Sequence, residues 1–325
     1  MDLSIIIVNW NSAGFVRKCL ASIFADPDPP GREVIVVDNA SYDECAEMAA
    51  REFPWVKFVQ SPENVGFARA NNLGFRHSAG RVLLFLNPDT EILGSALEIL
   101  LEAANRLPRA GAIGCRLLNS DGSVQTSCIQ SFPTILNQML DSEFLRRRFP
   151  RSALWGMAPL YLAGTEPSGV EAISGACLMI KRDVFEDIGQ FSTDYFMYAE
   201  DIDLCRKARR KGWINYYAPR ATVRHHGSGS SRNARTNFSV VTGVDSLWRY
   251  FRKFQGAAYA NFYRRALFVA ALGRQGALSA GKRLSFAPAS RDEIDGSLKK
   301  WAAILHWSMG LMNRGESKMP NADPL

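Results

Sequence analysis

Glycine-rich phosphate loops are missing from this sequence. Neither G-x-G-x-x-G nor G-x-x-x-x-G-K-[ST] follows the first apolar segment. This argues against a dinucleotide-binding fold and against a P-loop. Any phosphate-bearing ligand would therefore have to be held without a glycine cradle.

Long apolar runs are missing as well. No window holds about 18 consecutive apolar residues, so we expect no membrane-spanning helix. The first four residues lack the basic region of a signal peptide, and the apolar run Ile5–Val8 ends at Asn9. We interpret this run as a strand and expect a cytoplasmic protein.

C-x-x-C pairs are also absent, although the chain has six cysteines. Each cysteine falls within an expected strand or helix, which favours buried thiols in a reducing compartment over a disulfide framework. The six are Cys19, Cys45, Cys115, Cys128, Cys177 and Cys205.

What is present is a chain of 325 residues with a net charge of +7. This length can form one large domain or two. The segment Ser239–Ser290 holds eight basic residues and one acidic residue, so it accounts for the whole net charge. We expect no nucleic-acid partner, because this basic segment carries no known nucleic-acid-binding motif.

The first 110 residues alternate between short apolar runs and amphipathic segments. This alternation predicts an α/β fold, with a mostly parallel sheet and helices on both faces. The expected strands are Leu3–Val8, Glu33–Val37, Val56–Gln60 and Arg81–Leu86, and the expected helices are Ser12–Phe24, Tyr42–Glu52, Gly66–Ser78 and Ser95–Arg106.

The second half is less regular. Strands are expected at Ala112–Leu117, Ser123–Cys128, Ile173–Ile180 and Asn215–Ala218, and a short helix at 181–188. Between them, Ser131–Gly169 is rich in proline and predicts a long irregular loop. A loop of this length within a domain is usually functional or mobile.

Polar side chains follow several of the expected strands. They are Asn9, Asp38, Asn39, Asn87 and Asp89. One interpretation is that they only form turns, which such residues favour. The other is a binding site, because ligands of parallel sheets bind beyond the carboxyl ends of the strands.

The segment Phe196–Arg206 places Glu200, Asp201 and Asp203 at the start of a helix that Gly212 ends. One interpretation is a charged helix start, since the helix dipole favours acids there. The other is that one carboxylate, held beside aromatic residues, acts as a general base.

Taken in order, these segments resemble the glycosyltransferase family 2 proteins of the GT-A fold, in particular the rhamnosyltransferase-like branch. The likeness covers roughly Leu3–Ser231. The matching pieces are Ile5–Asn11, Val36–Ser41, Asn64–Asn72, Leu86–Glu91, Ser174–Cys177, Phe196–Leu204 and His225–Gly227.

The resemblance implies transfer of a sugar from a nucleotide diphosphate donor to an acceptor hydroxyl, with inversion at the anomeric carbon. Asp201 matches the general base of the family. Glu200 would orient that base or help to hold the acceptor. Asp203 would point to another face of the helix, where we expect a structural role.

The resemblance also implies Mg²⁺ or Mn²⁺ beneath the leaving diphosphate. The metal motif of the family is Asp-x-Asp, but here it is Asn87-Pro88-Asp89, so the first carboxylate is missing. Asp89 and His225 are the predicted metal ligands, with His226 less suited. The alternative for His225 is a strand-end histidine bonded to backbone.

For the donor, Asp38 matches the family residue that contacts the base or ribose. A carboxylate can accept from a pyrimidine N3–H, which favours a dTDP- or UDP-sugar such as dTDP-rhamnose. Two further positions have open alternatives, since Asn64 could cap a helix and Arg69 could reach the diphosphate or only lie on the surface. The predicted donor-binding residues are Asn9, Asp38, Asn64, Arg69, Asn72 and Asn87.

The tail repeats a basic amphipathic pattern over Phe238–Phe254 and Ala258–Leu272. Basic helices with aromatic residues are typical of a membrane surface. A peripheral contact with the inner face of the cell membrane would suit a lipid-linked acceptor. The alternative is that these helices pack on the catalytic domain.

We therefore expect a GT-A catalytic domain at 1–235, divided into a nucleotide-binding half (1–110) and an acceptor half (111–235), in which 131–169 forms a flap near the acceptor. A helical region at 236–317 and a disordered tail at 318–325 follow. The expected enzyme would build a polysaccharide or glycolipid. Two alternatives are a sugar nucleotidyltransferase, although its basic activation loop is absent, and a non-catalytic sugar-nucleotide-binding protein.

Overall fold

The computed structural model describes residues 1–25, 31–140, 143–162, 164–227, 237–284 and 288–311. The chain divides into two compact units. Unit 1 comprises Met1–Phe132, Ser142–Phe196 and Glu200–Ser230, and unit 2 comprises Pro133–Asp141, Met197–Ala199 and Ser231–Leu325. The predicted domain boundary at residue 235 and the predicted disordered tail at 318–325 lie outside the described residues.

Unit 1 is built on one mixed sheet. Within the described residues, nine strands take part, in the order β3-β2-β1-β4-β10-β6-β11-β5, with β8 paired to β11. Strands β1, β2, β3 and β4 are parallel, whereas β10 runs antiparallel between β4 and β6. The bounds are β1 Leu3–Asn9, β2 Arg32–Asp38, β3 Lys57–Gln60, β4 Val82–Leu86, β5 Thr90–Leu93, β6 Ala110–Leu118, β8 Ser168–Val170, β10 Cys177–Lys181 and β11 Ile214–His225.

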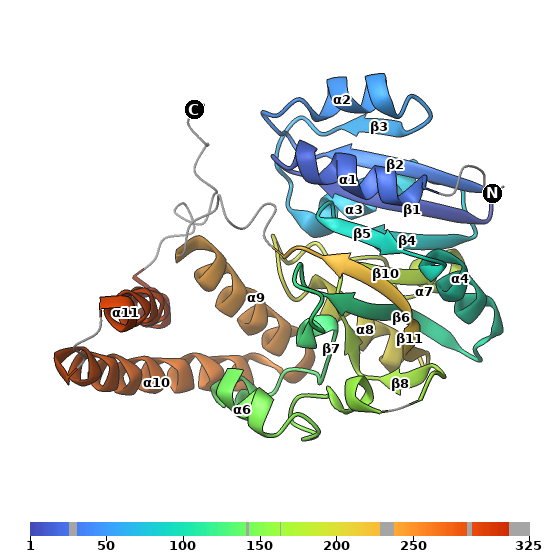
Figure 1. The fold of residues 1–325 in the computed structure, drawn as a ribbon. Helices are drawn as coiled ribbons and strands as arrows, with labels where there is room; N and C mark the ends of the chain where they lie inside the picture. The colour runs from blue at the N-terminus through green and yellow to red at the C-terminus, as the bar shows by residue number, and fades with distance from the viewer. Residues whose placement is uncertain (26–30, 141–142, 163, 228–236, 285–287, 312–325) are drawn as a thin grey trace. The chain divides into compact units, whose positions relative to one another are not determined.

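Helices lie on both faces of this sheet, with α1 and α3 on opposite sides of the first strands (Figure 1). The predicted α/β layering is therefore present. Unit 1 also contains a two-stranded ribbon of β7 (Ile129–Gln130) and β9 (Ala172–Ile173). Its helices are α1 Ala13–Ile23, α2 Cys45–Glu52, α3 Phe67–Arg76, α4 Ala96–Arg106, α6 Glu143–Arg148, α7 Arg182–Asp187 and α8 Glu200–Arg210, with 3₁₀ turns η1 Thr126–Cys128 and η2 Ala158–Tyr161.

The core of unit 1 lies on both sides of the central strands. Every residue of β1 and β4 is buried, as their unbroken apolar runs predict. The Phe85 ring of β4 contacts the rings of Phe185 and Phe191, with its centroid 4.9 and 4.7 Å from theirs. Such packing fixes the strand ends, where the polar residues gather.

Three predicted strands differ from the observed ones. Ser123–Cys128 is not a strand: Val124 forms a single bridge to Leu118, and a 3₁₀ turn follows. The expected strand Ile173–Ile180 is divided between β9 and β10. The expected strand at Asn215–Ala218 is longer, because an irregular register between Ala218 and Thr222 lets the chain pass its proline and continue as β11.

Two other predictions need correction. Strand β5 was not expected, because its four residues follow the Asn87-Pro88-Asp89 turn without a clear alternation. The segment Ser131–Gly169 is not wholly irregular, because it contains α5 (Ile135–Met139), α6 and η2. All six cysteines are buried and free, as predicted.

Unit 2 consists mainly of helices α5 (Ile135–Met139), α9 (Asn237–Gln255), α10 (Ala257–Leu284) and α11 (Pro288–Met309). The predicted apolar faces of its basic helices pack within the unit. Phe251 of α9 contacts Tyr263 of α10, with ring centroids 4.8 Å apart. Arg264 and Arg274 of α10 lie over Trp307 and Trp301 of α11. Among the described helices, none combines the length and the apolar character that a membrane crossing needs.

Candidate active site

The first part of the site lies where β1 and β2 end. These strands run parallel with Asn9 opposite Asp38. The Asn9 side-chain amide donates to Asp38 Oδ1 at 2.8 Å, and both residues are buried. Asp38 Oδ2 also accepts from the Ser41 amide at 3.0 Å and from Gln60 Nε2 at 2.8 Å. The sheet thus brings these two predicted donor-binding residues together.

Asp43 completes this corner. It accepts from the Ala13 backbone amide at 2.7 Å and from Asn9 Nδ2 at 3.2 Å. The Ser12 side chain makes no capping bond to α1. A carboxylate from another loop therefore occupies the helix start, where the dipole favours negative charge.

Asp38, Asp43 and Cys45 lie close enough to share a cation, with their ligand atoms within 4.8 Å of one another. However, burial and the neighbouring carboxylates raise the pKa of Cys45 to about 12. A protonated thiol is a poor metal ligand. In the structure the two carboxylates also accept hydrogen bonds, Asp38 from Asn9 Nδ2 and Asp43 from Asn9 Nδ2 and the Ala13 amide.

Asn64 lies next to this corner but does not cap α3 with its side chain. Its Oδ1 accepts from Asn39 Nδ2 at 2.8 Å and from the Gly66 amide at 3.1 Å. Gly66 is the N-cap residue, with φ of +81°. A Cβ at Gly66 would lie 2.3 Å from the Phe196 carbonyl oxygen, so only glycine fits there.

The other two α3 positions behave differently from each other. Both ends of the Asn72 amide bond to the Phe191 backbone, at 2.8 and 3.2 Å. Asn72 therefore holds the Phe191 loop, while one Nδ2 hydrogen and one Oδ1 lone pair are not used by these two bonds. Arg69 has an exposed side chain on the same helix. Donor binding by either residue stays a prediction.

The second part of the site is the turn between β4 and β5. Asn87 Nδ2 lies 3.3 Å from His225 Nε2, and Asp89 Oδ1 lies 3.3 Å from the same nitrogen. The antiparallel pairing of β5 and β11 places His225 opposite Thr90, which explains this meeting. The structure thus brings together Asn87 and the two predicted metal ligands.

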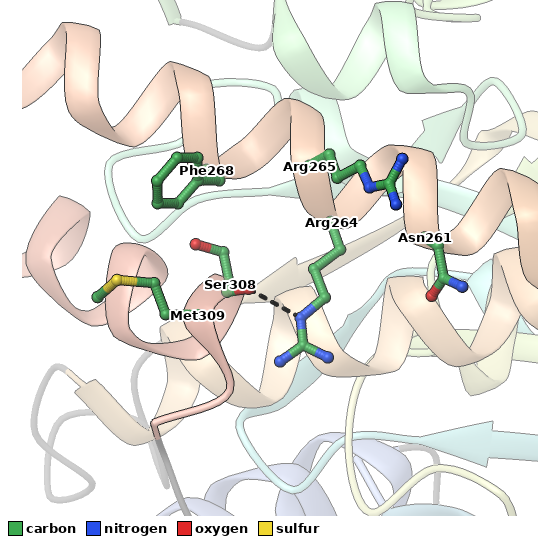
Figure 2. A pocket seen from close by; sticks show the side chains of 6 residues that line it. All are labelled: Asn261, Arg264, Arg265, Phe268, Ser308 and Met309. Atoms are coloured by element: carbon green, nitrogen blue, oxygen red, sulfur yellow. Dashed lines mark hydrogen bonds between the residues drawn. The ribbon is translucent and has the colours of Figure 1, made fainter.

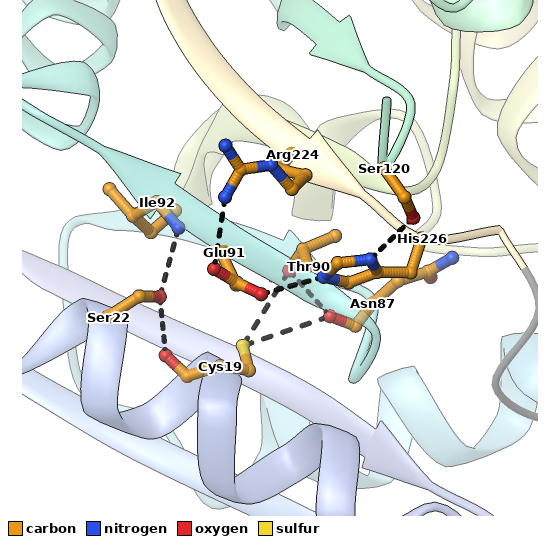
Figure 3. Close-up of polar contacts among 9 residues, drawn as sticks. All are labelled: Cys19, Ser22, Asn87, Thr90, Glu91, Ile92, Ser120, Arg224 and His226. Carbon is orange, nitrogen blue, oxygen red and sulfur yellow. Dashed lines mark hydrogen bonds and ion pairs between the residues drawn. The ribbon is translucent and has the colours of Figure 1, made fainter. Parts of the chain in front are cut away.

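Side chains of helix α1 contact this turn and the start of β5. Thr90 Oγ1 donates to the Asn87 carbonyl oxygen at 2.7 Å, and the Cys19 thiol lies 3.6 Å from the same hydroxyl. Ser22 Oγ accepts from the Ile92 amide at 2.9 Å (Figure 3). The turn is therefore held at several points before any ligand binds.

The tautomer of His225 follows from one neighbour that the sequence did not indicate. His225 Nδ1 lies 2.7 Å from Gln125 Oε1. Because this amide oxygen can only accept, Nδ1 carries the hydrogen. The Nε2 lone pair then faces both Asn87 Nδ2, which can donate to it, and Asp89 Oδ1, each 3.3 Å away. A cation placed between Nε2 and the Asp89 carboxylate could be bound by both.

His226 has a different set of contacts. Its Nδ1 lies 2.7 Å from Ser120 Oγ and its Nε2 lies 2.7 Å from Glu91 Oε1 (Figure 3). The bond from His226 and the nearby Arg224 guanidinium hold the pKa of Glu91 below its usual value, against the effect of burial. Both ring nitrogens of His226 are engaged, which leaves His225 as the better candidate ligand.

The third part is the start of α8. Asp201 Oδ2 accepts from the Gly175 amide at 2.8 Å, and Oδ1 accepts from its neighbour Ile202 at 2.8 Å. Burial raises the pKa of Asp201, although these backbone bonds act in the opposite direction. A raised pKa makes the carboxylate a better proton acceptor than an exposed aspartate.

A short backbone link joins Asp201 to the turn Asn87-Pro88-Asp89, called the metal-motif turn below. Gly175 donates to Asp201, and the carbonyl of Ala176 accepts from the Asn87 amide at 2.9 Å. The small residues at 174–176 interrupt the strand here and allow this close approach. The candidate base therefore lies two residues of backbone away from Asn87.

The other two acids of α8 are buried. Asp203 accepts from Ser192 Oγ at 2.6 Å and from Tyr195 OH at 2.8 Å, which agrees with the predicted structural role. Glu200 lies directly before Asp201, and its role as orienting group stays a prediction.

Sequence reasoning missed three residues of the site: Asp43, Gln60 and Gln125. Asp43 stands five residues after Asp38 in a polar loop, which could have signalled a second carboxylate. Gln60 is the last residue of β3, so the rule that polar strand ends form sites could have found it. Gln125 lies in a segment expected to be a strand, and nothing in the sequence marked it.

Comparison with curated proteins gives relatives of a consistent kind. The chain is 32% identical over 242 residues to an N-acetylglucosaminyl-diphospho-decaprenol L-rhamnosyltransferase of Mycobacterium tuberculosis, covering 70% of this chain and 77% of the relative. It is 30% identical to the low-salt glycan biosynthesis hexosyltransferase Agl10 of Haloferax volcanii, covering 65% and 62%. It is 22% identical to the rhamnosyltransferase WbbL of Escherichia coli, covering 80% and 96%.

Solved structures support the fold. A mannosyltransferase of Pyrobaculum calidifontis, in complex with GDP-Man and Mn²⁺, aligns with a TM-score of 0.57 at 19% identity, over 94% of this chain and 86% of that one. GalNAc-T7 with UDP, GalNAc and Mn²⁺ aligns with a TM-score of 0.54 at 17% identity, over 69% and 43%. The predicted GT-A fold is thereby confirmed.

Family matches agree with both comparisons. Residues 4–189 match the glycosyl transferase family 2, and residues 115–295 match the glycosyl transferase family group 2. The first match includes the strand-end corner, the metal-motif turn and Gly175. This chain belongs to glycosyl transferase family 2, as a rhamnosyltransferase-like member.

Proposed function

We propose that the protein is an inverting glycosyltransferase that moves rhamnose or another hexose from a dTDP- or UDP-sugar to a hydroxyl of a glycan or lipid-linked acceptor. The observation that carries this proposal is the link from Asp201 through Gly175 and Ala176 to Asn87. This link supports the proposal because it connects the Asp201 carboxylate, the proposed proton acceptor, with the turn that bears the proposed metal ligands. A single in-line displacement needs both groups at one place.

Asp201 is the proposed general base. As the acceptor oxygen bonds to the anomeric carbon, the bond to the diphosphate oxygen breaks and the hydroxyl proton passes to the Asp201 carboxylate. The amides of Gly175 and Ile202 hold one carboxylate oxygen each, so the group is oriented in advance. Glu200, directly before it, would orient the base or help to hold the acceptor.

Asp89 and His225 are the proposed ligands of Mg²⁺ or Mn²⁺. Neighbouring ligands of an octahedral ion lie about 3 Å apart when each bond is about 2.1 Å. The observed distance of 3.3 Å between Asp89 Oδ1 and His225 Nε2 fits that arrangement. The bound ion would neutralise charge on the departing diphosphate. Mn²⁺ in both structural neighbours gives further support.

Asp38 is the proposed contact for the nucleotide base. A carboxylate has about four acceptor positions, and three donors reach Asp38 in the structure. The remaining position could accept the N3–H of uracil or thymine, so we favour UDP- or dTDP-linked donors. Asn9 positions Asp38, while Asn64, Arg69, Asn72 and Asn87 are proposed around the rest of the donor.

The names of the relatives support a proposal for the acceptor class. The Mycobacterium tuberculosis relative is named for a diphospho-decaprenol substrate, and the Haloferax relative for glycan biosynthesis. We therefore propose a lipid-linked or glycan acceptor in polysaccharide or cell-wall assembly. The protein would work in the cytoplasm, peripherally on the inner face of the cell membrane.

A donor screen tests this function. Thermal shifts measured with Mn²⁺ and a panel of nucleotide sugars should show stabilisation by a dTDP- or UDP-sugar. The stabilising donor should then release its nucleoside diphosphate in the presence of a polyprenyl-diphosphate glycan. No stabilisation by any donor would contradict the proposal. Binding without transfer to any acceptor would favour a non-catalytic sugar-nucleotide-binding protein instead.

A further inference from the structure

Helix α10 has a second apolar face, which is exposed. Tyr263, Leu267 and Ala271 form its buried stripe, at steps of four residues. On the other side, Phe262, Val269 and Leu272 are 62%, 67% and 49% exposed. Successive helix positions at steps of three and four residues lie on one face. Arg265 falls between Phe262 and Val269 in this spacing, so the exposed stripe carries a positive charge at its centre.

All charged residues of α10 are basic. The helix runs for 28 residues and contains five basic residues and no acidic residue. Arg265 is exposed on the apolar stripe. A face that combines large exposed apolar side chains with positive charge complements an acidic lipid surface, where the apolar groups enter the interface and the cations meet the headgroups.

A groove beside this stripe adds fixed positive charge. It has a volume of about 410 Å³ and is lined by Asn261, Arg264, Arg265, Phe268, Ser308 and Met309 (Figure 2). Arg264 donates to the carbonyl oxygens of Ser308 at 3.0 Å and Trp307 at 2.8 Å. Its guanidinium also lies over the Trp307 ring, 5.2 Å from the centroid. The cation is therefore held in place before a headgroup arrives.

We propose that the exposed stripe Phe262–Arg265–Val269–Leu272, with the adjoining arginine-lined groove, is the surface through which the protein binds a bilayer containing acidic phospholipids. This deepens the proposed peripheral membrane role and assigns it to a particular face. The predicted amphipathic faces of α9 and α10 pack inside unit 2, whereas this stripe lies on the opposite side of α10. Phosphate headgroups would meet Arg264 and Arg265, and Phe262 and Val269 would enter the acyl boundary.

Vesicle co-sedimentation of the full chain tests the proposal. We expect binding to phosphatidylcholine vesicles that contain phosphatidylglycerol, much weaker binding without it, and release at high salt, because salt screens charges at the surface. Arg265→Glu should weaken binding about thirtyfold, since each basic residue near the surface contributes about fivefold. The double variant F262S/V269S should weaken it at least tenfold.

Matched variants in unit 1 serve as controls. Arg220→Glu makes the same charge change at an exposed residue, and Leu162→Ser removes a 55% exposed apolar side chain. Both should bind vesicles like the parent chain, and circular dichroism should show that every variant is folded. Equal loss in the control variants, or unchanged binding in F262S/V269S, would overturn the proposal. So would concentration-dependent dimers that the double variant abolishes, because the stripe would then be an interface between two copies.

The assay contains no nucleotide sugar and follows no transfer. Membrane binding can therefore succeed or fail separately from the proposed enzymatic function. If the chain transfers sugar but ignores acidic vesicles, only the membrane surface is wrong. If it binds vesicles but no donor, only the transferase proposal is wrong.

Discussion

The backbone amide of Gly175 donates to Asp201 Oδ2 at 2.8 Å, and this bond fixes the orientation of the candidate base. The next residue in the chain, Ala176, bonds to Asn87. One short peptide segment therefore positions the base and touches the metal-motif turn. Its small side chains matter because a Cβ on Gly175 would lie 3.3 Å from Asp201 Cβ and 3.4 Å from Oδ2.

Gly175→Ala should displace Asp201 by a few tenths of an ångström. We expect kcat to fall about tenfold or more, because small misplacements of a catalytic group are costly. The KM for the donor should change little, since the atoms that an added Cβ on Gly175 would meet belong to Asp201 and not to the nucleotide corner at Asn9 and Asp38. Steady-state kinetics measure both, and Gly169→Ala is the control because the added Cβ meets only an ordinary contact at 3.6 Å. Equal effects of the two variants would contradict the positioning role.

Asp201→Asn should abolish most of the activity while it leaves the fold intact. General base catalysis contributes about 10²- to 10⁴-fold, so kcat should fall by this factor. The amide oxygen of asparagine can still accept from Gly175, so donor affinity measured by calorimetry should be retained. The exposed Asp183→Asn serves as the matched control. A D201N variant with parental kcat would remove Asp201 from the mechanism.

The raised pKa of Asp201 also predicts how stability depends on pH. A carboxyl whose pKa is higher in the folded chain than in the unfolded chain stabilises the fold fully below the unfolded value, near 3.8. That stabilisation is lost as the pH rises through the folded pKa. The Tm of the parent relative to D201N should therefore fall over this window, while activity rises as the base ionises. Thermal melts over a pH series measure the difference, and parallel Tm curves would show that the pKa is not raised.

Much of the fold could be predicted from local signals. Each of the strands β1, β2 and β4 contains an unbroken apolar run, at Ile5–Val8, Val34–Val37 and Val82–Leu86. The helices between them have a clear period, so the places of these elements follow from local pattern. The β10–β4 antiparallel pairing was not predictable in this way. It depends on contacts between segments about 90 residues apart, which no local pattern encodes. Likewise, Pro219 suggested a strand end at Ala218, but an irregular register absorbs it.

The residues of the candidate site also fall into those that a local pattern indicates and those that depend on distant contacts. Asn9, Asp38, Asn87 and Asp89 could be found because parallel strands bring their carboxyl ends to one edge. Gln125 could not be found in this way. Its contact with His225 depends on the position of its side-chain amide beside a 3₁₀ turn, which no local sequence pattern indicates. Asn72 is a motif position that suggested donor binding. In the structure its side chain bonds to the Phe191 backbone, and donor binding there stays a prediction.

Metal binding should be weak in the absence of donor. The turn at Asn87 lacks the first carboxylate of the usual motif, so Asp89 is the single acidic ligand from this motif and the diphosphate would supply further oxygens. Titration calorimetry with Mg²⁺ alone should give little heat, and the same titration with a nucleoside diphosphate should show binding. Tight Mg²⁺ binding to the nucleotide-free protein would contradict this assignment.

Gln125→Leu should weaken metal binding without touching a metal ligand. Gln125 Oε1 fixes the hydrogen of His225 on Nδ1, and leucine removes that acceptor while it keeps a similar volume. Partners of this kind change metal affinity by about 10- to 100-fold. Mn²⁺ titration by electron paramagnetic resonance, with nucleoside diphosphate present, measures the change.

Gln130→Leu in the β7 ribbon is the control, because Gln130 pairs with Ala172 there rather than with His225. Recovery of affinity in Gln125→Glu, which keeps the acceptor oxygen, would separate the tautomer effect from lost packing, and equal weakening in Gln125→Leu and Gln125→Glu would argue against it.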